Sequence, residues 1–208
     1  MIIKFDGVDG CGKSTLTQAA ARHLAKRGHR VALLAEFSSP AEYPPGAPGR
    51  VPLAAMRIRE TALDPAFDCD DMERQLLLHF LSRRVNRVDI PFLRARNDFV
   101  VVDRSTLSNY AYAGALDPGL SAFSDITMSN VETANVIFLI DTPIDLCLAR
   151  ISARSSDAVE KKGRAYFERV RDQFNARATG NPCIRALDGR GEIDELLRQV
   201  VSVVDELS

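Results

Sequence analysis

A short glycine-rich segment near the start of the chain constrains the fold more than any other feature. Residues 7–15 read Gly-Val-Asp-Gly-Cys-Gly-Lys-Ser-Thr, the pattern G-x-x-x-x-G-K-[ST] of a phosphate-binding loop. In such a loop the glycines let backbone N–H groups point at phosphate oxygens, and the following helix adds its positive end. Lys13 would reach the β- and γ-phosphates of a nucleoside triphosphate, and Ser14 would hold Mg²⁺. We expect cofactor contacts from Gly7, Asp9, Gly10, Cys11, Gly12, Lys13, Ser14 and Thr15.

The residues around this loop predict an α/β fold. An apolar run over 2–5 precedes the loop, a helical pattern over 14–27 follows it, and a second apolar run occupies 31–35. Strand, loop, helix and strand in this order form a parallel βαβ unit, whose sheet is covered by helices on both faces. Further strands are expected at 99–102, 136–140 and 183–187, a turn at 117–119, and helices at 53–63, 72–96, 108–115, 121–130, 144–154, 166–178 and 193–207.

The long helical region over 72–96 has apolar side chains near helical spacing and is expected to kink near Pro91. We interpret most of these side chains as core: Leu76, Leu77, Phe80, Leu81, Val85 and Val88. The proline-rich segment 38–52 predicts a loop, which would form either a rim of the ligand pocket or a simple surface connection.

Composition and charge narrow the class of protein. The chain has 208 residues and a net charge of −1, which favours one globular domain over 1–208 without an extended basic surface. Binding of nucleic acid or of an anionic membrane is therefore not expected. Four widely spaced cysteines without a C-x-x-C pair argue against zinc and disulfides and favour a reducing, cytoplasmic location. Because we recognise neither a leader nor a membrane-spanning run, we expect a soluble protein.

Two further features point to phosphate chemistry. The third expected strand ends in Asp103-Arg104, and a carboxylate at this end of a parallel strand could hold Mg²⁺ together with Ser14, or form a structural ion pair. The polar segment 155–163 could close over phosphates as part of a lid over about 150–164, or remain a solvated loop. The basic residues around it are Arg150, Arg154, Lys161, Lys162 and Arg164.

These motifs together resemble the thymidylate kinase family of P-loop nucleoside monophosphate kinases, and the similarity covers nearly the whole chain. The loop with its preceding Phe5-Asp6 is similar to the family's first motif, and 166–171 is similar to the helix after the family's lid. The resemblance implies a five-stranded parallel sheet flanked by helices with a short lid, usually in a homodimer. It also implies ATP and Mg²⁺ as cofactors, a small nucleotide as substrate, and an adenine-binding turn at Asp188.

The resemblance also implies which residues bind the acceptor nucleotide. Asp9 matches a family residue that contacts the deoxyribose 3′-hydroxyl. Arg104, Ser108 and Tyr112 match a motif in which the arginine binds the acceptor phosphate and the aromatic residue crowds the 2′ side of the sugar. The run 78–80, ending in Phe80, with Arg84 four residues later, is similar to the segment whose aromatic residue stacks on thymine and whose arginine hydrogen-bonds it. The alignment also allows Arg83 in this last role.

The chain departs from the family pattern on the acceptor side. The family carries an arginine for the acceptor phosphate just after the second strand, whereas residues 35–40 here read Ala-Glu-Phe-Ser-Ser-Pro. Ser105 and Ala113 also replace the usual aromatic residue and glutamine of the Asp-Arg motif. Candidates for the missing arginine are Arg50, Arg57 and Arg59. Because the loop lacks the extra arginine of some members, the lid would supply positive charge from Arg150, Arg154 or Arg164.

The leading hypothesis is ATP-dependent phosphorylation of a deoxynucleoside monophosphate, dTMP to dTDP. An acceptor phosphate is already anionic, so alignment and charge neutralisation suffice, with Lys13, Asp103, Arg104 and Arg154 as the catalytic residues. Three alternatives stay open. They are a deoxynucleoside kinase with Glu36 as substrate-binding base, a kinase for a modified pyrimidine monophosphate, and a non-catalytic P-loop module.

Overall fold

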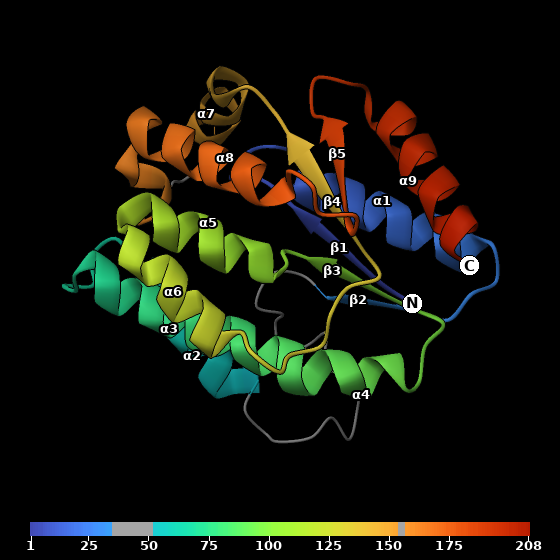
Figure 1. Ribbon diagram of the computed structural model, residues 1–208, viewed down its shortest axis with the longest axis horizontal. Coiled ribbons are helices and arrows are strands. Elements are labelled where there is room, and N and C mark those ends of the chain that lie inside the picture. The colour runs from blue at the N-terminus through green and yellow to red at the C-terminus, as the bar shows by residue number, and fades with distance from the viewer. Residues whose placement is uncertain (35–51, 154–156) are drawn as a thin grey trace.

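The computed structural model describes residues 1–34, 52–153 and 157–208. Its sheet has five parallel strands in the order β2-β3-β1-β4-β5 (Figure 1). The strands are β1 (Ile2–Asp6), β2 (Val31–Leu34), β3 (Phe99–Asp103), β4 (Val136–Asp141) and β5 (Ile184–Asp188). The predicted α/β fold with a five-stranded parallel sheet is confirmed.

Strand β1 lies at the centre of the sheet and directs the chain to both sides. It pairs with β3 on one edge and with β4 on the other, so the connections after β1 and after β3 leave in opposite directions. Ligands of open parallel sheets bind at such a switch point, beyond the carboxyl ends of the strands. The phosphate-binding loop follows β1 and Arg104 follows β3, so both lie at this point.

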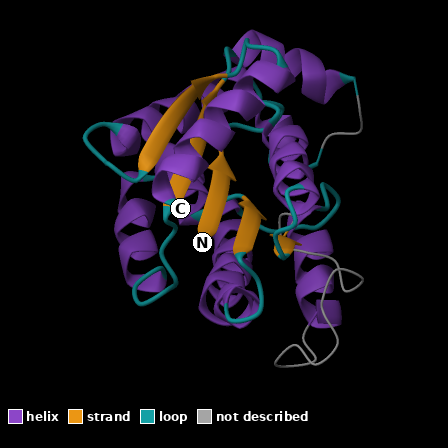
Figure 2. Cartoon of the chain, turned by 90° about the vertical axis from the view of Figure 1, so that its right-hand side faces the viewer, coloured by secondary structure: helices purple, strands orange, loops and turns teal. Residues whose placement is uncertain are grey.

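Helices cover both faces of the sheet, as Figures 1 and 2 show. On one face Ile3, Phe5 and Val101 belong to the core that includes α1 (Lys13–Lys26) and α9 (Ile193–Leu207). On the opposite face Ile2, Val100 and Val102 pack against α4 (Ile90–Arg94). Helices α5 (Thr106–Leu116) and α8 (Arg164–Ala178) pack against each other, and α8 contacts β4 and β5. The other elements are α2 (Pro52–Leu63), α3 (Asp71–Arg84), a π-helical turn (Val85–Asp89), α6 (Pro118–Thr127), α7 (Ile144–Ser152) and a 3₁₀ turn (Glu160–Lys162). No helix of the described ranges is both long and apolar enough to cross a bilayer.

The central strand of the sheet carries a buried lysine. Lys4 of β1 is 1% exposed, and its Nζ donates to Asn86 Oδ1 at 2.5 Å and to the Glu132 carbonyl at 3.3 Å. Burial lowers the pKa of Lys4 to about 8. The ammonium is therefore tied by hydrogen bonds to the π-helical turn, which contains Asn86.

One of the local predictions is wrong, and another is confirmed with a change of helix type. The expected turn at 117–119 is the start of α6, because the Asp117 side chain accepts the Gly119 N–H at 2.6 Å as an N-cap and Pro118 is the first helical residue. Asp-Pro is as suitable for a helix start as for a turn. The helical region predicted over 72–96 is helical from Asp71 to Arg94, with a π-helical turn at Val85–Asp89, and Pro91 lies in the first turn of α4.

The core prediction for α3 is wrong for Leu76 and Phe80, which are 42% and 53% exposed, although Leu81 is buried as expected. The buried face of α3 is polar instead and carries Arg74, Gln75, His79 and Ser82. Arg74, His79 and Ser82 form hydrogen bonds within the protein; for example, His79 Nε2 and Ser124 Oγ are 2.8 Å apart. The loop expected over 38–52 lies outside the described residues, except that Pro52 begins α2.

Candidate active site

The phosphate-binding loop needs glycine because it passes very close to other backbone segments. A Cβ atom on Gly10, whose φ is +79°, would lie 2.4 Å from the carbonyl oxygen of Cys147 in α7. A Cβ atom on Gly7, whose φ is +144°, would lie 2.7 Å from the carbonyl oxygen of Ile140 in β4. Helix α1 then begins after Gly12 with no side-chain cap and no acidic residue in its first turn. Its first N–H groups are therefore available to an anion.

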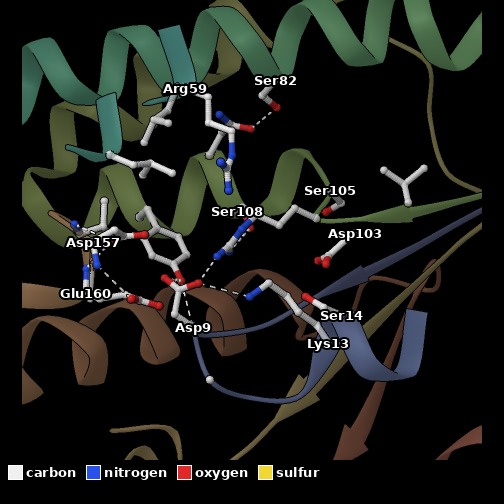
Figure 3. A pocket seen from close by; sticks show the side chains of 18 of the residues that line it. Asp9, Lys13, Ser14, Arg59, Ser82, Asp103, Ser105, Ser108, Asp157 and Glu160 are labelled. Atoms are coloured by element: carbon white, nitrogen blue, oxygen red, sulfur yellow. Dashed lines mark hydrogen bonds and ion pairs between the residues drawn. The ribbon is translucent and has the colours of Figure 1, made fainter. Parts of the chain in front are cut away.

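A cavity of about 560 Å³ opens beside this loop, and Figure 3 shows the side chains that point into it. The loop and the end of β3 form one part of its wall, and α2, α3 and α5 form another. The predicted site residues that line it are Asp9, Gly10, Gly12, Lys13, Ser14, Thr15, Asp103, Arg104, Ser108, Tyr112 and Arg150. The fold thus brings together residues that are far apart in the sequence.

Asp9 is the centre of the polar contacts in the cavity. Its carboxylate forms ion pairs with Arg104 and with Lys13, the latter at 3.3 Å, and it accepts the Tyr112 hydroxyl at 2.8 Å. Burial opposes ionisation of Asp9, but Arg104 and Lys13 outweigh it, so the pKa of Asp9 is lowered. Burial and Arg104 act against the charge of Lys13, yet the carboxylates around it leave the pKa of Lys13 raised. Both groups are therefore charged at neutral pH.

Arg104 is held in place by its backbone and by a buried carboxylate that the sequence analysis did not single out. Its φ of +73° is in the left-handed region, which is uncommon for a side chain of this size, and strained residues of this kind cluster at functional sites. Its backbone N–H donates to the Phe5 carbonyl at 2.8 Å. Asp6, at the end of β1, accepts both the N–H and the hydroxyl of Ser105, at 3.0 and 2.6 Å, and the hydroxyl of Ser108. The buried Asp6 therefore anchors the start of α5 next to Arg104, and its position directly before Gly7 was the available signal.

Asp103 is a suitable ligand for a metal ion. It is 7% exposed, and its Oδ1 atom is buried without a hydrogen-bond partner among the described residues. Figure 3 shows Asp103 on the same side of the cavity as Ser14 and Lys13. Carboxylate and hydroxyl oxygens are ligands that Mg²⁺ accepts, with phosphates and water completing its shell. The chemistry of Asp103 and Ser14 thus fits Mg²⁺, and their role as its ligands stays a prediction.

The end of the cavity next to α3 differs from what the resemblance implied. Phe80 points away from the cavity, and Arg84 pairs with Asp89 at 3.6 Å; neither residue lines the cavity. Arg83 binds the carbonyls of Thr127 and Ser129. The residues that line this end are Gln75, Leu78, Ser82, Val85, Asn86 and Asn109. The polar residues 75, 79, 82 and 86 recur at helical spacing, and this was the sequence signal for the buried face.

Two of the arginines that the sequence offers for the acceptor phosphate, Arg57 and Arg59, lie on α2 but differ in position relative to the cavity. Arg59 of α2 lines the cavity, and its Nε atom is buried without a partner among the described residues. In Figure 3 its side chain extends from α2 toward Ser108. Arg57, on the same helix, is exposed and does not line the cavity. The remaining candidate Arg50, like Glu36, lies outside the described residues.

Of the three arginines expected in the lid segment 150–164, only Arg150 lines the cavity among the described residues. Arg150 Nη1 donates to the carbonyls of Gly10 and Cys11 at 3.1 and 3.2 Å, so it stabilises the loop. Arg164 is half exposed and pairs with Asp145 and Glu168, away from the cavity. Arg154 lies outside the described residues. The residues from this segment that do line the cavity are Asp157, Val159 and Glu160.

Asp188, the predicted adenine contact, lies at the end of β5 outside this cavity. It is exposed and binds Arg190, whose hydrogen bonds lower the pKa of Asp188. The turn after it is packed tightly, because a Cβ atom on Gly189 would lie 1.8 Å from Thr142 Oγ1. Thr142 in turn donates to the Cys11 carbonyl at 3.0 Å, which connects the Asp188 turn to the phosphate-binding loop.

Comparison with known proteins agrees with this geometry. The sequence model of the family described as Thymidylate kinase matches residues 5–200, a span that contains every residue lining the cavity. The chain belongs to the thymidylate kinase family. A thymidylate kinase of Pseudomonas fluorescens is 35% identical over 190 residues, covering 88% of this chain and 83% of the relative. A thymidylate kinase of Thermosipho africanus is 30% identical over 214 residues, covering 99% of this chain and 98% of the relative.

Membership of the thymidylate kinase family makes the changed end of the cavity informative. The aromatic residue and arginine that the resemblance assigned to thymine are not provided here by Phe80 and Arg84. The phosphate side retains the loop, Asp103 and Arg104. The residues that the resemblance assigned to the phosphates therefore line the cavity, whereas the two that it assigned to the base do not.

Proposed function

We propose that this chain transfers the γ-phosphoryl group of ATP to dTMP, giving ADP and dTDP, with Mg²⁺ as cofactor. The observation that carries the proposal is one cavity with two anion-binding sets, the loop with Lys13 on one side and Arg104 with Arg59 on the other. A site that only bound ATP would not need the second set. Family membership supports the same reaction.

The residues of the cavity suit a transfer between two phosphates. The acceptor oxygen of a monophosphate is already anionic, so the site needs to align it and neutralise charge rather than remove a proton. Arg104 would hold the acceptor phosphate, and Asp9 and Tyr112 would position both its guanidinium and the sugar. Lys13 and the loop N–H groups would hold the donor phosphates. Mg²⁺ held by Asp103 and Ser14 would supply further charge neutralisation at the transferred group.

An acceptor screen with Mg-ATP tests the proposal. Coupled ADP release is measured with dTMP, thymidine and other nucleosides and monophosphates at equal concentrations. We expect dTMP to give the highest kcat/KM and thymidine to give only background. Phosphorylation of thymidine alone would refute the proposal in favour of a nucleoside kinase, and slow ADP formation that no acceptor accelerates would favour a non-catalytic module.

Arg59 is our candidate for the arginine that the chain lacks after its second strand. Its guanidinium reaches the acceptor side of the cavity, so Arg59→Ala should raise KM for dTMP about 10- to 100-fold, because a charge-assisted contact to phosphate is worth roughly 1.5–3 kcal/mol. KM for ATP should change less than threefold. Steady-state kinetics with each substrate varied measures both constants.

Arg57→Ala is the matched control for this variant. Arg57 is an exposed arginine two positions earlier on the same helix, and we expect its removal to leave both KM values within twofold. Equal effects of the two substitutions would show that α2 contributes to the site only through its overall charge. If KM for dTMP is unchanged in Arg59→Ala, Arg59 does not bind the acceptor phosphate.

We also propose that the chain forms a homodimer through α3 and α6. Met72, Leu76 and Phe80 are spaced four residues apart on α3 and are 44%, 42% and 53% exposed, and Ile126 on the neighbouring α6 is 73% exposed. Apolar side chains at this spacing form one stripe, and such a stripe on a soluble protein is typical of an interaction surface. The resemblance to a family that is usually dimeric supports a second copy as the partner.

Phe80→Glu should convert the dimer to a monomer, with the dimer dissociation constant raised at least about 100-fold, because each side of the interface would bury a charge. Sedimentation velocity over a concentration series measures this constant. Leu207→Glu is the control, since Leu207 is 47% exposed at the end of α9, and it should leave the dimer intact. A monomeric wild-type protein at micromolar concentration would contradict the proposal.

A further inference from the structure

The buried lysine of the central strand differs in chemistry from the side chains around it. Alternation along β1 directs Lys4 to the same face as Ile2, which packs in an apolar cluster with Ile90. Burial lowers the pKa of Lys4 to about 8, and the carboxylates of Asp6 and Glu132 offset only part of this effect. An apolar side chain would avoid this loss of hydration. Packing of the sheet alone therefore does not explain a lysine at this position.

The ammonium of Lys4 connects three segments of the chain. It donates to Asn86 Oδ1 at 2.5 Å and to the Glu132 carbonyl at 3.3 Å, and the Asn86 carbonyl accepts the Glu132 N–H at 3.2 Å. These contacts join β1 to the π-helical turn and to the segment before β4. Within the turn, Arg84 pairs at 3.6 Å with Asp89, five residues later, which is the spacing of one π-helical turn. Specific side-chain contacts thus stabilise this irregular turn.

The π-helical turn sets the rotation of α3 about its own axis. Its hydrogen bonds run from residue i to i+5 instead of i+4, so it contains one residue more than an α-helical turn. Each residue of an α-helix turns the chain by about 100°, so the extra residue rotates α3 relative to α4 by roughly this angle. Ile90 and Leu93 pack α4 onto the sheet. The turn therefore decides which side chains of α3 face the cavity.

Two further hydrogen bonds connect the turn to the wall of the cavity. Asn86 Nδ2 donates to the Ser82 carbonyl at 2.8 Å, and Ser82 Oγ donates to Asn109 Oδ1 of α5 at 2.6 Å (Figure 3). Ser82, Asn86 and Asn109 all line the cavity, as does Tyr112 of α5, the predicted sugar contact. The series of contacts that starts at Lys4 therefore fixes α3 against α5 on the acceptor side.

We infer that Lys4 is a positioning residue for the acceptor nucleotide, because it fixes the π-helical turn and thereby holds α3 at the distance and rotation that the acceptor side of the cavity requires. The inference rests on the proposed monophosphate kinase activity. Lys4 does not itself line the cavity, so it acts through Asn86 and α3. Arg104 is held by Phe5 and Asp9 instead. Loss of the Lys4 ammonium therefore weakens acceptor binding and leaves the transfer step in place.

Lys4→Met tests this role, because methionine is similar in size and removes the ammonium. We expect KM for dTMP to rise about tenfold, as after the loss of a buried charged hydrogen bond, with kcat and KM for ATP within threefold. Hydrogen exchange followed by mass spectrometry should become at least about threefold faster in the peptide 82–89, which contains the turn.

Ile3→Val is the control for Lys4→Met. Ile3 lies in the core on the opposite face of β1, so the loss of one methyl group weakens packing of the same strand without touching the Lys4 contacts. Both KM values and the exchange of peptide 82–89 should stay within twofold of the wild type.

The outcomes separate this inference from the proposed function. If the wild type phosphorylates dTMP and Lys4→Met keeps KM for dTMP within twofold, the inference is wrong and the kinase assignment stands. Unchanged exchange in peptide 82–89, or an equal rise of KM for ATP, would refute it as well. If the wild type phosphorylates no nucleotide, the function and the inference fall together.

Lys4→Gln provides the answer if Lys4→Met does not fold. Its amide keeps a polar group at this position but is uncharged and one bond shorter than the lysine side chain. We expect KM for dTMP to rise at least about threefold in this variant, because the contacts to Asn86 and Glu132 are no longer both made. A KM for dTMP equal to that of the wild type would contradict the inference.

Discussion

Arg104→Gln should lower kcat for dTMP phosphorylation about a thousandfold, because an arginine that stabilises the charge of a transferring phosphoryl group contributes at least this much. The effect should appear mainly in kcat and in KM for dTMP, while ATP affinity measured by calorimetry changes less than threefold. Glutamine keeps the carbon chain as far as Cδ and removes the charge, and a non-glycine residue already occupies this left-handed position with its φ of +73°. Single-turnover measurements with saturating Mg-ATP report the chemical step directly.

Arg164→Gln is the control for Arg104→Gln. Arg164 belongs to the segment that the sequence suggested as a lid, but its side chain pairs with Asp145 and Glu168 away from the cavity. We expect its kcat to remain within twofold of the wild type. Normal turnover of Arg104→Gln would overturn the role given to Arg104, and a large loss in Arg164→Gln would show that the lid takes a different arrangement during the reaction.

Lys13→Met should also lower kcat about a thousandfold, since Lys13 is the cation placed to follow charge on the donor phosphates during transfer. ATP affinity should fall about tenfold, because the loop N–H groups and the start of α1 still bind the phosphates. In the same variant Asp9 loses one of its two cations, so its pKa should rise toward the ordinary value. Coupled ADP release measures kcat, and calorimetry measures the affinity for ATP.

Lys26→Met provides the comparison for Lys13→Met. Lys26 lies on the same helix α1 but is exposed at its far end, so its removal should change neither kcat nor ATP affinity by more than twofold. A kcat of Lys13→Met within tenfold of the wild type would show that the loop lysine is not needed for transfer in this chain.

The donor side of the site could be predicted from sequence because its information is local. Nine neighbouring residues supply the phosphate-binding loop, and the apolar runs around it require a buried parallel strand. The ends of β1 and β3 meet in any sheet of this topology, so Asp103 and Arg104 could be assigned to the loop without coordinates. What local reasoning could not supply was the support from Asp6, whose partners Ser105 and Ser108 are about a hundred residues away in the chain.

The acceptor side could not be predicted in the same way because helix rotation determines it. The apolar residues of α3 suggested that Leu76 and Phe80 face the core, whereas the helix buries its polar stripe against α5 and α6. A polar stripe can be buried when its groups find partners, as His79 and Ser82 do with Ser124 and Asn109. The exposed apolar stripe is then left for another surface, which the proposed dimer would cover.

The sequence by itself determined the fold class, the phosphate-binding loop and the position of Arg104, since these depend on strand patterns and on a motif of adjacent residues. The tertiary structure alone decided which face of α3 lines the cavity, which arginine of α2 reaches it, and which way the Asn109 amide points. These last features depend on contacts between residues distant in the chain, whose geometry is set by packing of whole helices and not by the residues of any one segment.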